Sequence, residues 1–417
     1  MPGYAANGLT ACESCDGVHR MVPVPAGGRA LCGRCGALLY RHLPGSLDRS
    51  TALYLAALLL FLLANWGPFV ALKLGDRVEQ TRLISSAFAL HQAGMPELGV
   101  LVVLTSVVFP ALAIGGMLYL LLAQRLGMRP AGRARVWRVV RMVTPWSLTG
   151  VFMLGLLVSV VKLQGLASVI PGVAFFAFIG LLLVAAAAAA SFDVAVLWPR
   201  LGPVTERLPI GSAAELGYAS CHTCALLVAR PATGQPWACP RCDSAVHGLR
   251  RHDSIARTWA LLTTASLLLI PANLLPVMTV VRFGQGEPST ILAGVAHLLR
   301  DGAVPLALLV LFASVVVPLA KIIALVMLLV TTQRGSNWRT RDRTVLYRVT
   351  EAVGAWSMLD IFLVGILVAL VRMDALASVS PGLGASFFGA AVVLTMLAAH
   401  SFDPRLIWDR AARAQKA

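Results

Sequence analysis

Eight cysteines form four Cys-x-x-Cys pairs in this sequence, and paired thiolates at that spacing are ligands for a tetrahedral metal ion. The pairs fall into two sets, Cys12, Cys15, Cys32 and Cys35 near the N-terminus and Cys221, Cys224, Cys239 and Cys242 in the middle of the chain. In each set a short segment separates the two pairs, as in zinc ribbons. We therefore predict two structural Zn²⁺ sites, whose binding energy would help such small modules to fold.

A dithiol redox role is the alternative interpretation of these cysteines. A redox site has one reactive pair with a depressed thiol pKa, and nothing in the sequence distinguishes one pair from the other. His19 and His42 lie near the first set, but four cysteines already complete a tetrahedral shell, so we expect both histidines to be bystanders. Few aromatic residues surround either set, which favours a docking or structural role over RNA binding.

A second group of chemically active residues lies inside apolar sequence in the second half of the chain. Lys321 lies about ten residues, roughly 15 Å of helix, from the polar end of its apolar run, beyond comfortable snorkelling reach. Ser314 precedes it by two helical turns on the same face, and Pro318 lies between them. We expect the proline to kink this helix and to free a backbone carbonyl beside the serine and the lysine.

Asp360 ends the segment Trp-Ser-Met-Leu-Asp, at a depth close to that of Lys321. Two buried charges of opposite sign are expected to form an ion pair, and Ser357 lies on the same helical face as Asp360. The last apolar run adds Thr395, His400 and, nearer its rim, Asp403. These residues form either a polar network that only fixes helix packing or a functional pocket with a proton-responsive relay.

Composition indicates the elements that must hold these residues. The chain has 417 residues, of which 58% are hydrophobic and 13% charged, and its mean hydropathy of +0.78 excludes an ordinary soluble domain. Apolar runs about long enough to cross a ~30 Å hydrocarbon core lie at roughly 51–73, 97–123, 143–163, 173–198, 258–281, 303–332, 352–373 and 383–408. The polar N-terminal segment has no apolar core or cleavage site typical of a signal peptide.

The second half of the chain repeats the first. An offset of 210 residues places Trp146-Ser147 on Trp356-Ser357, Pro171-Gly172 on Pro381-Gly382 and Ser191-Phe192-Asp193 on Ser401-Phe402-Asp403, and an offset of 208 places Asn65 on Asn273. Such an offset identifies a tandem duplication. The first copy has Ala113 where the second has Lys321, and Gly150 where the second has Asp360. We infer that one half carries the site and the other scaffolds it.

The predicted fold is an all-α polytopic membrane protein of two tandem repeats, each with four transmembrane helices after a small cytoplasmic zinc-ribbon-like module. Its expected parts are module 1 at 1–50, bundle 1 at 51–200, module 2 at 201–257, bundle 2 at 258–410 and a tail at 411–417. Asn65 and Asn273, each three residues before a proline, either line a cavity or bond carbonyls of their own helix.

Charge placement predicts the orientation. The net charge of +16 would suggest nucleic acid for a soluble protein, but most lysines and arginines here lie in the two cysteine segments, in the loops 124–142 and 333–348 and in the tail. By the positive-inside rule those segments and both termini are cytoplasmic. A reducing compartment also favours metal-bound thiolates over disulfides.

In combination, the duplicated cysteine modules and four-span bundles, the Trp-Ser-Met-Leu-Asp segment and the closing Ser-Phe-Asp-Pro-Arg-Leu-Ile-Trp-Asp at 401–409 resemble the paraquat-inducible protein A family, which includes PqiA and LetA types. The resemblance covers nearly the whole chain. It implies a bacterial inner-membrane component of an envelope lipid transport system, with a periplasmic MCE-domain protein as tunnel partner and phospholipid as cargo. The polar network that it implies for LetA-type proteins matches Ser314, Lys321, Ser357, Asp360 and Thr395 here.

We therefore predict a lipid transporter that is not an enzyme. No nucleotide-binding loop is present, so energy would come from a proton gradient, the partner or the lipid gradient. Two other functions stay open: a membrane adaptor that anchors the MCE partner without carrying lipid, and a cysteine-based membrane redox protein.

Overall fold

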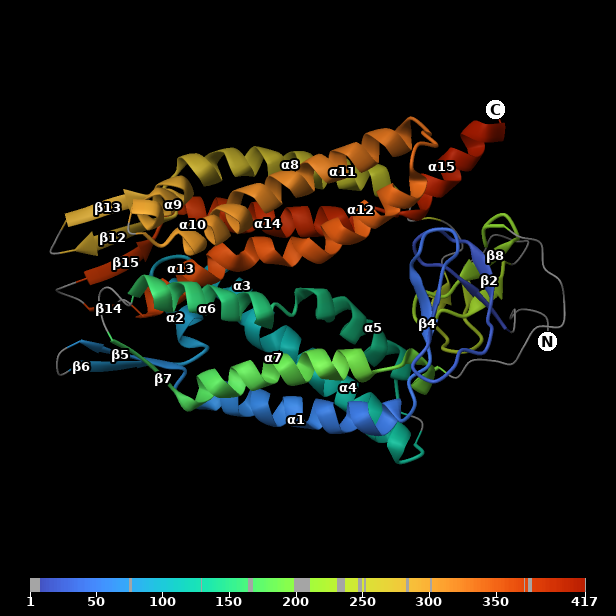
Figure 1. Cartoon of the computed structure of the whole chain (residues 1–417), viewed down its shortest axis with the longest axis horizontal. Helices are drawn as coiled ribbons and strands as arrows, with labels where there is room; N and C mark the ends of the chain where they lie inside the picture. Colours follow the sequence, from blue (N-terminus) through green and yellow to red (C-terminus); the bar gives the residue numbers. More distant parts are fainter. Residues whose placement is uncertain are drawn as a thin grey trace.

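The computed structural model describes residues 8–416 except 75–76, 129, 164–167, 199–210, 231–236, 247–249, 251–252, 283–284, 301, 371 and 374–376. The molecule is elongated along its helices (Figure 1). Both cysteine modules lie at one end, which we call the cysteine end. Short strands lie at the other, which we call the strand end.

The helices of the two halves correspond closely. The first half contains α1 (Ser46–Trp66), α2 (Ser85–Gln92), α3 (Pro96–Val103), α4 (Phe109–Arg125), α5 (Arg133–Val143), α6 (Thr149–Leu163) and α7 (Val173–Ser191). The second contains α8 (Ser254–Leu274), α9 (Ile291–Arg300), α10 (Val304–Leu311), α11 (Val317–Gln333), α12 (Thr340–Val353), α13 (Leu359–Leu370), α14 (Leu383–Ser401) and a final helix, α15 (Arg405–Lys416). Both α1 and α4 recur with identical lengths 208 residues later, as the duplication predicts.

Short irregular helical turns join some of these helices in both halves. The π-helical turns η1 (Leu104–Val108) and η4 (Phe312–Val316) link α3 to α4 and α10 to α11, and the 3-10 turns η2 (Thr144–Trp146) and η5 (Gly354–Met358) link α5 to α6 and α12 to α13. A third 3-10 turn, η3 (Val194–Val196), follows α7. Such interruptions place strain or open backbone groups at defined depths in a helix.

Seven helical stretches of the described chain are long and apolar enough to cross a membrane. Four lie in the first half and three in the second, so the protein is a multi-pass membrane protein. The eighth predicted span, 352–373, contains α13, whose 12 residues are too few to cross by themselves. Four spans in the second bundle therefore remain a prediction.

The strand end corrects the all-α prediction. Helices α1 and α8 end at Trp66 and Leu274, earlier than the predicted 73 and 281, because the chain turns at a proline and forms an antiparallel hairpin. The first hairpin, β5 (Val70–Leu74) with β6 (Arg77–Thr81), pairs with β7 (Ser168–Pro171). The second, β12 (Met278–Arg282) with β13 (Gln285–Ser289), pairs with β15 (Ala377–Pro381), which also pairs with β14 (Arg372–Met373). An apolar run alone does not distinguish a strand from the end of a helix.

Close backbone approach explains the repeated Pro-Gly pair at this end. A Cβ on Gly172 would lie 2.1 Å from the carbonyl oxygen of Pro68, and a Cβ on Gly382 would lie 2.2 Å from that of Pro276. Only glycine leaves room for these contacts. They bring the first residues of α7 and α14 against the turns that follow α1 and α8.

The repeated Ser-Phe-Asp segment ends α7 and α14, which therefore stop before the predicted 198 and 408. The hydroxyl of Ser254 donates to the carbonyl of Ser401 at 2.8 Å and accepts from the backbone N–H of Asp403 at 2.9 Å. Ser46 makes the same pair of hydrogen bonds with Ser191 and Asp193. In each half, the start of one helix thus holds the end of another, which is a structural role for this motif.

The two bundles form one packed body. A single core of buried residues includes side chains from both halves, and Phe152 of α6 packs edge-on against Phe362 of α13 with ring centroids 5.4 Å apart. Gly155 lets these helices approach, because a Cβ there would lie 3.2 Å from the Cβ of Phe362.

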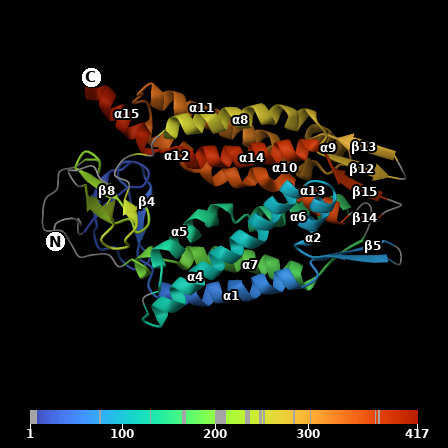
Figure 2. The ribbon, with the colours of Figure 1, turned by 180° about the vertical axis from the view of Figure 1, so that it is seen from behind.

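The modules are pairs of antiparallel hairpins, as zinc ribbons require. Module 1 contains β1 (Leu9–Ala11) with β2 (Val18–Arg20) and β3 (Arg29–Leu31) with β4 (Leu38–Arg41), and module 2 contains β8 (Tyr218–Ser220) with β9 (Leu227–Ala229) and β10 (Trp237–Ala238) with β11 (Ala245–Val246). The modules also pair with each other. Backbone bonds join Val18 to Gly211 and Ala213 to Asp16, and both views show the modules side by side (Figure 1 and Figure 2).

Candidate functional site

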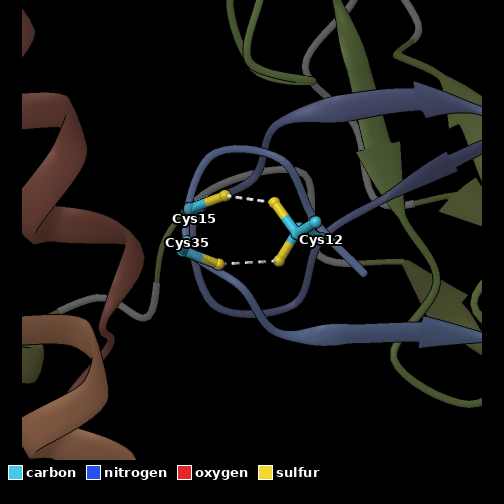
Figure 3. A group of neighbouring side chains, drawn as sticks. Cys12, Cys15 and Cys35 are labelled. Carbon is cyan, nitrogen blue, oxygen red and sulfur yellow. Dashed lines mark hydrogen bonds between the residues drawn. The ribbon is translucent and has the colours of Figure 1, made fainter. Parts of the chain in front are cut away.

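Each cysteine set converges on one point, as the spacing predicts. The four sulfur atoms of each set lie within 4.8 Å of one another. In module 1, the sulfurs of Cys12 and Cys35 are 3.5 Å apart (Figure 3). The sulfurs of Cys15 and Cys32 are also 3.5 Å apart. The corresponding distances in module 2, Cys221 to Cys242 and Cys224 to Cys239, are also 3.5 Å.

The local backbone explains this convergence. The fourth residue after the first cysteine of each pair has a positive φ: Asp16, Gly36, Ala225 and Asp243. In each pair that residue's N–H bonds back to the first cysteine's carbonyl, so the chain folds into a tight knuckle with both thiols on one side. Hydrogen bonds from Cys12 and Cys15 lower the pKa of the Cys35 thiol, whereas hydrogen bonds to Cys12 and Cys35 raise the pKa of the Cys15 thiol, so Cys35 is the sulfur of this set that most readily ionises.

The geometry fits a tetrahedral metal ion. A Zn–S bond of about 2.3 Å places sulfurs about 3.8 Å apart in a tetrahedron, close to the observed spacing. All of the sulfurs belong to buried residues except that of Cys242, which is half-buried. Both sets can therefore hold a metal ion.

His19 lies closer to the first set than a bystander would. Its Nε2 is 3.1 Å from the sulfur of Cys32, although it is not one of the four convergent ligands. Burial lowers the pKa of His19, which favours the neutral ring. A neutral imidazole beside a thiolate can donate a hydrogen bond that orients the ligand.

Each module packs its buried cluster mainly on the bundle of the other repeat, although Arg41 of module 1 also donates to the carbonyl of Ala189 in α7. Module 1 packs its cysteines against α8, α11, α12, α14 and α15 in one buried cluster. Arg348 of α12 donates to the carbonyl of Cys35 at 3.0 Å, and Arg34 lies over the ring of Trp408 with its guanidinium carbon 4.3 Å from the centroid. Sequence order alone would pair module 1 with the bundle that follows it.

Module 2 packs mainly on the first bundle in the same crossed manner. Arg141 of α5 donates to the carbonyl of His222 at 2.9 Å, and Arg138 donates to the hydroxyl of Ser244 at 2.9 Å. The arginines that sequence analysis used only for orientation therefore also hold the modules in place.

Lys321 is buried, as its position in α11 predicts, with 4% of its surface exposed. Its Nζ has no hydrogen-bond partner among the described residues. A Cβ on Gly354 of η5 would lie 2.7 Å from this nitrogen, so the ammonium group occupies the space that the glycine leaves open. A cavity of about 340 Å³ lies beside Lys321 and is also lined by Arg348, Glu351 and His400.

The interruption that Pro318 was expected to cause near Lys321 is a π-helical turn. The helix carries the π-helical turn η4 just before Pro318, and the first repeat carries η1 just before Pro110. The hydroxyl of Ser314 lies within this turn and donates to the carbonyl of Val310 at 2.6 Å. The wide turn thus accommodates the proline.

The remaining predicted residues occupy two places. The hydroxyl of Thr395 donates to the carbonyl of Val392 at 2.8 Å, and His400 lies at the Lys321 cavity with its Nδ1 2.9 Å from the carbonyl of Met396. Asp403 lies instead where Ser254 at the start of α8 bonds to the end of α14. There Arg405 binds its carboxylate through two hydrogen bonds.

The side chains of Ser357 and Asp360 lie outside the described part of the structure, so the Lys321–Asp360 ion pair remains a prediction. The backbone places Ser357 in η5 and Asp360 in the first turn of α13. Both η4 and α11, which carry Ser314 and Lys321, contact η5, which in turn contacts α14 with Thr395. The elements that hold the predicted network therefore meet.

Glu351 and Arg348 line this cavity and Trp146 contacts its His400, and the sequence alone did not indicate any of the three as a site residue. An Oε1 atom of Glu351 lies 3.9 Å from Nε2 of His400. The ring of Trp146, from the first repeat, stacks on His400 with centroids 6.2 Å apart. The Trp-Ser pair shared by both repeats was a signal, but nothing in the sequence placed the first copy beside the second site.

Asn65 and Asn273 were expected either to line a cavity or to bond carbonyls of their own helices, and the structure shows the second. Their side-chain amides donate to the carbonyls of Phe61 and Leu269, each at 2.8 Å and four residues earlier in the same helix. They therefore bond carbonyls of their own helices before each turn.

Comparison with known proteins agrees with this architecture. The Paraquat-inducible protein A family matches residues 47–202 and again 255–412. The chain is 35% identical to the Intermembrane transport protein PqiA of Escherichia coli (strain K12) over 404 residues, which cover 96% of this chain and 95% of the relative.

Two further relatives are also similar over almost their whole length. The Lipophilic envelope-spanning tunnel protein A of Escherichia coli (strain K12) is 30% identical over 95% of this chain and 90% of its own, and a Probable intermembrane transport protein of Haemophilus influenzae is 27% identical over 98% and 96%. No solved structure matches the chain. The full-length similarity and the doubled family match show that the chain belongs to the paraquat-inducible protein A family.

Proposed function

We propose that this protein moves phospholipid between a bacterial inner membrane and a periplasmic MCE-domain tunnel partner. The names of its relatives, which refer to intermembrane transport and to an envelope-spanning tunnel, support this class of function. The observation that carries it is Lys321, a cation buried in a membrane helix beside a cavity and without a described hydrogen-bond partner. A buried charge is costly, and an anionic lipid headgroup would compensate it.

The orientation follows from charge. Both cysteine modules and the arginine-rich α5 and α12 lie toward the same end of the molecule (Figure 1), and positive residues favour the cytoplasmic side. We place the cysteine end and both termini in the cytoplasm. The strand end then faces the periplasm, where its two small sheets offer edges to the MCE partner.

The proposed mechanism uses charge rather than covalent chemistry. In one state Lys321 pairs with Asp360, and in the other it pairs with the phosphate of a lipid while Asp360 takes up a proton. Glu351 and His400 line the same cavity as Lys321 and lie 3.9 Å apart, so they would conduct that proton from the cytoplasm. Lipid enters where Trp146 of the first bundle meets His400 of the second.

The two cysteine sets would each hold one structural Zn²⁺, with their four thiolates as ligands. The metal would supply folding energy to the modules. Because each module docks on the opposite bundle, the metal sites would fix how the two bundles meet. The Lys321 side chain carries transport, and the metal takes no part in it.

Reconstituted lipid transfer tests this proposal. The protein is placed in donor vesicles with its MCE partner, and transfer of fluorescent phospholipid is compared for wild type, Lys321→Met, Asp360→Asn and the exposed control Arg334→Gln. We expect both network variants to lose transfer while remaining folded and bound to the partner, and the control to retain it. Full transfer by Lys321→Met would favour a lipid-free adaptor.

Native mass spectrometry of the same proteins gives a second readout. We expect two zinc ions in every variant and a bound phospholipid that Lys321→Met loses. Retention of that lipid in Lys321→Met would place the lipid pocket elsewhere.

A further inference from the structure

A second cavity lies at the junction of the two modules and α15. Figure 2 shows these elements together at the cysteine end of the molecule. Its volume is about 310 Å³. Module 1 contributes Asp16 and Arg34, module 2 contributes Tyr218 and Arg230, and the final helix contributes Asp409 and Arg413. Three segments far apart in sequence thus form one concave surface. We call it the head cavity.

The carboxylates of the head cavity are already compensated. Arg250 binds Asp409 through two hydrogen bonds of 2.5 and 2.7 Å and binds Asp16 through a third of 2.9 Å. Asp16 also accepts a bond from the backbone of Ala214 at 3.1 Å. Glu215, the third carboxylate in the wall, accepts from both the hydroxyl and the N–H of Ser212. These acidic groups are therefore held in place and do not need a cation.

Three arginines in the wall lack such compensation. Among the described residues, Arg34, Arg230 and Arg413 form no ion pair with a carboxylate. Arg34 is pre-positioned, because its guanidinium stacks over the ring of Trp408. A guanidinium fork recognises phosphate through paired hydrogen bonds, and three of them around one cavity create a positive potential in a partly enclosed space.

We propose that the head cavity binds a phosphate-bearing anion from the cytoplasmic side, with Arg34, Arg230 and Arg413 as its ligands. The tyrosine hydroxyl of Tyr218 adds a donor to the same wall. The ligand would touch both modules and α15, and α15 packs on the second bundle through Ile407 and Trp408. Its binding therefore stabilises the packing of the two modules against the second bundle. The site is independent of the transport function proposed above.

Inorganic pyrophosphate is the probe for a soluble ligand. Isothermal titration of the full-length protein in a neutral detergent is expected to show one saturable site. The double variant Arg34→Gln/Arg230→Gln is expected to weaken binding by at least about tenfold, since each charge-assisted hydrogen bond contributes about one power of ten. Arg413 is exposed, so the single variant Arg413→Gln is expected to fold normally and to lose less pyrophosphate affinity than the double variant.

A matched control separates the cavity from the general positive charge. Arg29→Gln/Arg135→Gln removes two exposed arginines that do not line the cavity and is expected to keep the wild-type affinity. Equal weakening in both double variants, or no saturable binding by wild type, would overturn the proposal. Thermal unfolding and metal content of each variant show that the comparison is between folded proteins.

Nanodiscs distinguish the two sources of phosphate. Pyrophosphate affinity is measured in discs of phosphatidylcholine with and without phosphatidylglycerol. Competition by phosphatidylglycerol that the cavity variant loses would assign the site to an anionic lipid headgroup. An unchanged affinity would assign it to a soluble phosphate compound.

Discussion

Gly354 and Lys321 meet where the turn η5 contacts helix α11 in the second bundle. A Cβ on Gly354 would lie 2.7 Å from the ammonium nitrogen of Lys321. The glycine belongs to η5, the turn that precedes Asp360, so its missing side chain sets how close the lysine comes to the Trp-Ser-Met-Leu-Asp segment.

Gly354→Ala therefore displaces the lysine ammonium without removing its charge. We expect a several-fold loss of lipid transfer with little change in stability, because the end of a flexible side chain can move aside. Gly115→Ala in α4 is the control, since a Cβ there meets no atom within 4 Å. Equal transfer by both variants would show that the position of the ammonium group is unimportant.

The ion pair between Lys321 and Asp360 is testable by a double-mutant cycle. If the pair forms, Lys321→Met and Asp360→Leu each lower the free energy of unfolding by about 3–5 kcal/mol, because each leaves a buried charge alone. The double variant recovers much of that loss. Additive effects, measured by denaturation in detergent, would mean that the charges do not interact.

Because each module packs mainly on the bundle of the other repeat, loss of its metal is expected to destabilise helices of that other bundle. Cys35→Ser in module 1 is expected to increase hydrogen exchange in α12 and α15, because those helices pack on that module. Cys239→Ser in module 2 is the matched variant and is expected to affect α5 instead. If each variant increased hydrogen exchange only in the bundle that follows its module in the sequence, the crossed arrangement would be contradicted.

Arg250 holds the two modules and α15 together. Burial alone would lower the pKa of Arg250, but Asp409 and Asp16 raise it above its ordinary value, so the guanidinium stays charged. Arg250→Gln leaves two shielded carboxylates unpaired and is expected to destabilise the protein by about 3–5 kcal/mol. The exposed pair of Arg339 and Asp342 is the control, and Arg339→Gln is expected to change thermal stability little.

Asp403 gives the protein an acid-sensitive contact. Burial would raise the pKa of this carboxyl, but hydrogen bonds and charge from Arg405 lower it below its ordinary 3.8. A lowered pKa in the folded state stabilises the protein above pH 3.8, and the stabilisation is lost as the pH falls through the lower value. Thermal unfolding between pH 3 and 7 should therefore show an acid loss that Asp403→Asn reduces and the exposed Asp342→Asn does not.

Several features were predictable because they depend on local chemistry. The cysteine spacing determined two convergent tetrads, since a knuckle of a few residues brings each pair together. Hydropathy determined seven of the eight predicted membrane helices, because helix length is set by the membrane core. The buried position of Lys321 followed from its depth in an apolar run.

Other features depend on contacts between distant segments, and only the tertiary structure decided them. The strands at residues 70–81 and 278–289 exist because each hairpin finds a third strand about 90 residues later in the chain. The crossed modules, the stacking of Trp146 on His400 and the bridge from Arg250 to Asp16 and Asp409 likewise join separate parts of the chain. Composition and spacing describe what each segment can do alone, whereas these contacts form only when folding brings the segments together.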